Sequence, residues 1–299
     1  MLSCVKARQH LRFLKVYMTK SKFLFTICSV IIITFLFTSG AWAGIRIDKP
    51  KVRISVAPGA YDSGEIKIEN TGKDPLSIKV YLEDWVYAEQ AGGKEFMPKG
   101  TTPLSCSNWI TFYPADFKLV PNGAQTVRYT VNVPADAKGG HYSVLFFETG
   151  GENVEGLNPQ GNTVVIKVLN RLGALFYVEP EGTIQKSAEL KNLNISLNLN
   201  NLIVAADFVN TGNTNITAKG TFDVLDDQGF VYARGEFDEV YTLPKDKVSV
   251  SAMAKSASLK PGTYDVLITL EFENGGTLIK EAQFSVSANG AITSVNQKN

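Results

Sequence analysis

The sequence is poor in the side chains on which most enzymes and metal sites rely. It has 2 histidines and 3 cysteines among 299 residues, and only His141 and Cys106 follow residue 43. General acid–base catalysis most often uses histidine, and a zinc site needs three or four cysteine, histidine or acidic ligands. Gly-x-Ser-x-Gly, Walker and Gly-x-Gly-x-x-Gly motifs are all missing. We therefore expect a protein that is not an enzyme and holds neither a cofactor nor a metal.

One enzymatic alternative stays open on the aromatic residues. A secreted carbohydrate-active enzyme would need a platform on which sugar rings stack, and five aromatic side chains lie close enough in sequence to form one. They are Tyr81, Trp85, Tyr87, Trp109 and Tyr113. Packing in a core or on a sheet face is the commoner use of such residues.

The first 43 residues have the pattern of a secretory signal peptide. They carry six basic residues and no acidic one, then the apolar run 23–37, then small residues at Ala41 and Ala43. We expect cleavage after Ala43, with Met18 as an alternative start and an uncleaved membrane anchor as the alternative structure. The run is shorter than the ~20 residues that a membrane span needs. The sequence thus predicts an exported protein, either periplasmic or secreted to the cell envelope.

Charge and cysteine content limit the remaining chain further. Removing the six basic residues of 1–43 from the 30 Lys and Arg leaves 24, against 29 Asp and Glu. An acidic body argues against a nucleic-acid partner, because such binding needs clustered cations. Cys106 alone cannot form an intrachain disulfide, so packing has to hold the fold, and we expect an inert thiol.

Apolar residues beyond position 44 alternate with polar ones, as in strands that are buried on one face. The clearest run is 127–133, where Val127, Tyr129 and Val131 alternate with Arg128 and Thr130. Turn sequences such as Pro-Asn-Gly at 121–123 and Asn-Gly-Gly at 274–276 separate these runs. Many short strands divided in this way predict an all-β fold of sandwiches.

The chain also resembles itself, which predicts two tandem immunoglobulin-like β-sandwich domains after the signal peptide. Segment 68–80 matches 208–220, segment 119–131 matches 242–252, and segment 140–148 matches 262–271. We place the domains at 45–179 and 183–289, with a tail at 290–299. Tyr142 and Tyr264 hold equivalent positions, and each is expected to form either a tyrosine corner or a core aromatic with its hydroxyl in water.

Segment 108–148 resembles the N-terminal domain of the periplasmic pilus-assembly chaperones, the PapD-like family. The matching positions are Phe112, Pro114, Phe117, Leu119, Pro121, Gln125, Thr126, Val127 and Arg128, followed by the strand 142–147 and by Leu175, Phe176 and Tyr177. The resemblance covers most of 45–180, and the second domain is only generically immunoglobulin-like.

The resemblance implies a chaperone that caps pilus or surface-fibre subunits by strand donation, with an outer-membrane usher as a further partner. An extended strand offers main-chain hydrogen bonds and alternating apolar side chains. The implied donor strand is 163–169, with Val164, Val165, Ile166, Val168 and Leu169. Whether two chains cap each other through such edges is left open.

The resemblance also implies two basic residues that hold the carboxylate at the end of the bound subunit. Arg53 matches the first position. Arg171 lies near the second, and Lys167 is the alternative. A competing hypothesis keeps the fold without the chaperone activity: tandem sandwiches also serve as scaffold or adhesion modules of the cell envelope. An unpaired, exposed 163–169 favours the chaperone, and a covered, polar strand favours the scaffold.

Overall fold

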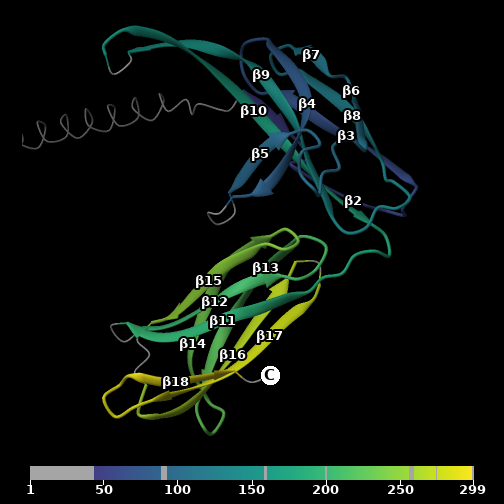
Figure 1. Cartoon of the computed structure of the whole chain (residues 1–299). Coiled ribbons are helices and arrows are strands. Elements are labelled where there is room, and N and C mark those ends of the chain that lie inside the picture. The colour runs from purple at the N-terminus through teal and green to yellow at the C-terminus, as the bar shows by residue number, and fades with distance from the viewer. Residues whose placement is uncertain are drawn as a thin grey trace, which may run out of the picture. The chain divides into compact units, whose positions relative to one another are not determined.

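The computed structural model describes residues 44–88, 93–157, 160–198, 201–255, 259–273 and 275–297 (Figure 1). The predicted signal peptide, residues 1–43, lies outside these ranges. All regular secondary structure in the described residues consists of β-strands, as the period-two alternation predicts. Among these residues there is no helix with the length and hydropathy needed to cross a membrane.

Residues 45–180 form two sheets. Sheet A has the spatial order β1 (Ile45–Ile47), β3 (Tyr61–Asn70), β8 (Ala124–Asn132) and β6 (Ile110–Tyr113). Sheet B has the order β2 (Lys51–Val56), β10 (Thr163–Pro180), β9 (His141–Leu157), β4 (Leu76–Tyr87) and β5 (Lys94–Pro98), and β7 (Asp116–Leu119) pairs with β4. Neighbouring strands are antiparallel except β2 and β10, which run parallel.

The two sheets enclose one hydrophobic core. Ile66 and Val127 from sheet A and Phe147 and Phe176 from sheet B are fully buried in the same cluster. Burying side chains of this size contributes about 1.5–3 kcal/mol each. Cys106 is buried there too. Burial and the nearby charge of Asp84 raise the pKa of its thiol well above the ordinary value, which keeps it protonated and unreactive.

Residues 188–297 form sheet C, which curls around a second core. Its order is β11 (Ala188–Asn198), β12 (Asn201–Asn210), β15 (Lys247–Ala254), β14 (Val231–Thr242), β13 (Ile216–Leu225), β16 (Gly262–Phe272), β17 (Thr277–Val286) and β18 (Ile292–Gln297). β11 approaches β17 and β18, and Phe208, Phe222 and Phe284 fill the interior. The predicted all-β fold of sandwiches is confirmed. The domain limits 45–179 and 183–289 stay a prediction.

The expected tail at 290–299 is wrong for most of its length. Ile292–Gln297 is strand β18, which pairs with Ala282–Val286 of β17 after a turn at Gly290. Ile292 and Val295 pack against the core of sheet C. They are three residues apart, because the register shifts between Ser285 and Val286 of β17. This shift hides the period-two signal in the sequence.

The internal repeat has the same local geometry in both copies. Asn70 and Asn210 end their strands fully buried, and the Oδ1 atom of each accepts a hydrogen bond from the backbone N–H two residues later, at 2.9 and 3.0 Å. In the matched turns, Asn122 and Lys245 both adopt a positive φ, of 57° and 75°. A lysine rarely adopts this conformation, so the backbone requirement of the turn persists in the second copy.

The two equivalent tyrosines differ in their use. The Tyr264 hydroxyl donates to the carbonyl of Lys260 at 3.0 Å, four residues upstream, which is the tyrosine-corner geometry. The buried Tyr142 hydroxyl instead accepts from the backbone N–H of Asn215 at 2.6 Å, in the loop before β13. Tyr142 therefore ties a strand of sheet B to a loop of sheet C.

Candidate functional site

The longest strands of the chain, β9 and β10, form a hairpin that runs beyond the rest of sheet B (Figure 1). They pair from His141 and Val178 to Leu157 and Thr163. On its other side, β10 pairs with β2 only over Leu175–Pro180. Within the described residues, positions 163–174 of β10 therefore have a free edge, whose backbone groups can bind a further strand.

The free edge carries exposed apolar side chains. Val165, Val168 and Leu169 have exposed fractions of 62%, 44% and 47%, and Val164 is half-buried. The side chains of the other two donor candidates, Ile166 and Lys167, lie outside what the structure describes. The register shifts between Val168 and Asn170, where Gly150 and Gly151 of β9 lie opposite Leu169. Such a bulge bends and twists the hairpin.

Arg53 lies within the paired β2–β10 segment, toward the end of β10 that is opposite to the free edge. It pairs with Tyr177 in the register, and its guanidinium carbon lies 4.8 Å from the centroid of that ring. The Nη2 atom of Arg53 is 3.0 Å from Oε2 of Glu273. Lys51, two residues earlier on the same face, contacts the same ring and the same carboxylate.

Arg171 occupies a different place and binds a different carboxylate. Its Nη1 lies 3.1 Å from both carboxylate oxygens of Glu83 and 3.3 Å from the Tyr81 hydroxyl, and its guanidinium covers the Phe146 ring at 4.0 Å. Burial would lower the pKa of Arg171, but the hydrogen bond with Tyr81 and the charge of Glu83 outweigh it and raise the pKa. The Arg171 guanidinium therefore stacks on an aromatic ring of sheet B and pairs with a carboxylate of the same sheet.

The structure does not bring Arg53 and Arg171 together. Arg171 precedes Tyr177, the register partner of Arg53, by six residues on β10, a separation of about 20 Å at the usual rise of a strand. The two cations therefore lie apart on sheet B, and their role as an anchor stays a prediction. Sequence reasoning missed Lys51, although the alternation in 51–56 already places it on the face of Arg53.

The aromatic residues of sheet B form a packed cluster rather than a sugar platform. Trp85 is 1% exposed, and its indole N–H donates to the carbonyl of Ser143 at 3.0 Å. Its ring lies edge-on to Tyr87, Tyr142 and Tyr177, with centroids 5.2, 5.6 and 5.4 Å away. A buried indole cannot stack on a sugar, so the platform expected as an alternative does not form around Trp85.

His141 is half-buried at the start of β9, with its ring centroid 4.2 Å from that of Trp109. Its Nδ1 is buried and has no hydrogen-bond partner among the described residues. Burial lowers the pKa of His141 below 6.5, although backbone hydrogen bonds at Lys138 and Ser105 oppose the change. These surroundings are those of a packing residue that folds in its neutral form.

Folding stability should therefore fall as the pH drops from about 7 to 5.5. In this window the unfolded chain binds a proton at His141 that the folded chain resists, so protonation favours unfolding. Denaturant unfolding at several pH values should show a shallower decline for His141→Gln than for the wild type. Equal slopes for the two proteins would contradict this assignment.

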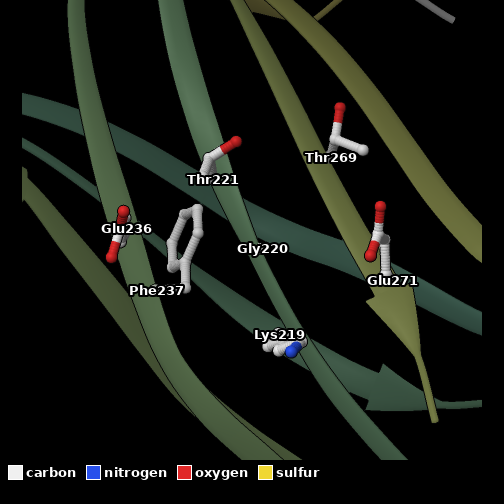
Figure 2. Close-up of a pocket in the computed structure, with 7 residues that line it drawn as sticks. All are labelled: Lys219, Gly220, Thr221, Glu236, Phe237, Thr269 and Glu271. Atoms are coloured by element: carbon white, nitrogen blue, oxygen red, sulfur yellow. The ribbon is translucent and has the colours of Figure 1, made fainter.

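A shallow depression of about 300 Å³ lies on sheet C, over β13, β14 and β16 (Figure 2). Gly220 lines this depression, and only glycine fits there because a Cβ would fall 1.9 Å from the carbonyl oxygen of Thr269. Glu236 and Glu271 lie on the strands to either side in Figure 2. The part of the chain that the structure describes contains no group of three or more His, Cys, Asp or Glu arranged to hold a metal.

Comparisons with known proteins find similarity only among solved structures. No family model matches the chain, and no curated protein matches it. The YadV chaperone is 13% identical with a TM-score of 0.42, over 81% of this chain and 100% of that one. A chain from a chaperone–tip adhesin complex of CFA/I fimbriae biogenesis is 16% identical with a TM-score of 0.45, over 80% of this chain and 98% of that one.

A third similar structure comes from the CsuC–CsuE chaperone–tip adhesion subunit complex of Acinetobacter baumannii. It is 10% identical with a TM-score of 0.41, over 80% of this chain and 98% of that one. All three structures are described as chaperones or chaperone complexes. Because these TM-scores lie below 0.5, we base the function on the chain's own residues and contacts.

Proposed function

We propose that this chain is an exported, non-enzymatic chaperone that holds the subunits of a pilus or another surface fibre by strand donation. The observation that carries the proposal is the free edge of β10 at positions 163–174, with its exposed apolar side chains. We call the bound subunit the client. The proposal places the protein in the periplasm, where an outer-membrane usher would accept the client.

The free edge suits a client that lacks one strand of its own sandwich. An extended strand satisfies the unpaired backbone groups of the client, and alternate side chains fill its open core. A long, apolar and uncovered edge is otherwise an aggregation hazard. Exposure of Val165, Val168 and Leu169 is therefore best explained by a partner that covers them.

We further propose that Arg53 holds the carboxylate at the end of the client, with Lys51 as the second cation. The support is their shared face on β2 and their common contact with a carboxylate, that of Glu273. Arg171 is engaged with Glu83 instead. Lys167, on the donor strand, stays an alternative candidate for a cation that binds the client's carboxylate.

The scaffold alternative predicted a polar, covered strand at 163–169. Val165 and Leu169 are apolar and exposed, and the edge is unpaired on the β2 side within the described residues. This observation favours the chaperone over an envelope scaffold or adhesion module. The free edge could also be covered by the free edge of a second copy of this chain. The experiment has to distinguish such a dimer from a complex with a client.

The test is site-specific photocrosslinking in the native host. A photoreactive amino acid at Val165 should link the chain to one defined β-rich subunit, identified by mass spectrometry after purification. The same group at Ile279, an exposed apolar position on β17 of sheet C, is the matched control and should give no such product. A crosslink only to a second copy of this chain, or equal products from both positions, would refute the proposal.

A further inference from the structure

The surface at Lys51 and Arg53 is a built anion site. Both side chains lie on one face of β2, and both cations contact the face of the Tyr177 ring, at 5.1 and 4.8 Å from its centroid. A third cation, Lys94, lies beside this pair, with its Nζ 5.4 Å from the ring centroid of Tyr87. Burial, and then the charge of Lys51, lower the pKa of Lys94. The neighbouring cations of Lys51 and Arg53 favour an anion beside them.

The chain itself supplies that anion. Glu273 follows the end of β16, and its carboxylate oxygens lie 3.3 Å from the Lys51 Nζ, with Oε2 3.0 Å from Arg53. The backbone N–H of Glu273 donates to the carbonyl of Thr217 at 2.8 Å, which fixes the position of the residue. Burial would raise the pKa of Glu273, but the charges of Arg53 and Lys51 outweigh it and lower the pKa. Glu273 is therefore ionised in this site.

The contact is open to exchange. The exposed fractions of the Lys51, Arg53 and Glu273 side chains are 39%, 28% and 42%, so water and another carboxylate can reach all three groups. Ion pairs with this exposure contribute little to stability, because water screens their charges. A carboxylate delivered on a bound peptide can compete with a contact of that strength.

We propose that Glu273 occupies the Lys51–Arg53 site as an internal substitute for the client's terminal carboxylate, and that a client must displace it to bind fully. This inference rests on the proposed function and adds an autoinhibitory contact to it. In the free protein, Glu273 neutralises the two cations. In the complex, the client's carboxylate takes its place, and Glu273 turns to the solvent.

The test compares wild type with Glu273→Gln, which keeps the side-chain shape and removes the charge. The probe is the peptide acetyl-(Thr-Val)4, with either a free or an amidated C-terminus, and binding is measured by calorimetry. We expect Glu273→Gln to bind the free-acid peptide about two- to fivefold more tightly than wild type, with the amide unchanged. Glu271→Gln, which removes a charge two residues away, should behave as wild type.

A second measurement tests the anion site without any client protein. The side-chain N–H resonances of Arg53 should shift when the free-acid peptide is added to Glu273→Gln, and the triple variant with Lys51→Gln and Arg53→Gln should lose the preference for the free acid. Equal affinity of Glu273→Gln for acid and amide, or no binding, would overturn the inference. A client crosslinked at Val165 would then leave the chaperone function standing. Conversely, a preference for the free-acid peptide without a client crosslink at Val165 would support the anion site and contradict the chaperone function.

Discussion

Replacing Val165 and Leu169 together by aspartate is expected to weaken capture of the client by about 100-fold or more, since each buried aliphatic side chain contributes about 1.5–3 kcal/mol. Both side chains are exposed in the free protein, so their loss removes nothing from its core. Surface substitutions of this kind usually change folding stability by no more than about 0.5 kcal/mol. The measurement is the amount of client that co-purifies with the chain, beside a thermal melt of each variant.

The matched control replaces two exposed apolar side chains elsewhere. Met253→Asp with Ile279→Asp introduces the same charges on sheet C and should leave client capture at the wild-type level. If the β10 variant still captured its client fully while folding normally, the free edge would not be the contact surface. Loss of capture in both double variants would point to charge alone.

Trp85→Ala is expected to cost about 3–5 kcal/mol of folding stability, the range measured for large aromatic side chains removed from cores. Trp85 contacts three tyrosine rings and donates one buried hydrogen bond to Ser143, and the substitution leaves a cavity between them. Leu243, in the turn between β14 and β15, belongs to the same cluster. Urea unfolding followed by circular dichroism gives the change directly.

Trp109 offers the comparison for this variant. It is only partly buried, at the margin of the core, where it packs on His141. Trp109→Ala should therefore cost clearly less than Trp85→Ala. A loss below about 1 kcal/mol for Trp85→Ala would show that the cluster adds little to stability.

The fold was predictable because alternation is a local signal. Each buried strand shows it within five to ten residues, as in 127–133, and the repeated Asn-Thr-Gly turns revealed the second copy of the unit. Strand β18 escaped prediction because a bulge breaks its alternation. Asp84 was equally hidden: it is a fully buried carboxylate that accepts hydrogen bonds from Thr102 and Ser105.

The candidate site was predictable only in part. The apolar run 163–169 is visible in the sequence, but its free edge depends on where β2 stops pairing with β10. The anion site depends on Glu273, which lies 222 and 220 residues from its two partners. No local pattern joins residues so far apart. The family resemblance points to Arg171, but the resemblance carries no information on its surroundings, where the guanidinium covers the Phe146 ring and pairs with Glu83.

The parallel pairing of β2 with the end of β10 also sets an order of events for a newly made chain. Lys51 and Leu175 are paired although 124 residues separate them. A chain that emerges N-terminus first must therefore keep β2 without this neighbour until nearly the whole of 45–180 has appeared. Such long-range pairing is intrinsically slow. β10 is also the last strand of sheet B along the chain, so completion of the sheet depends on the same strand whose edge stays free over 163–174.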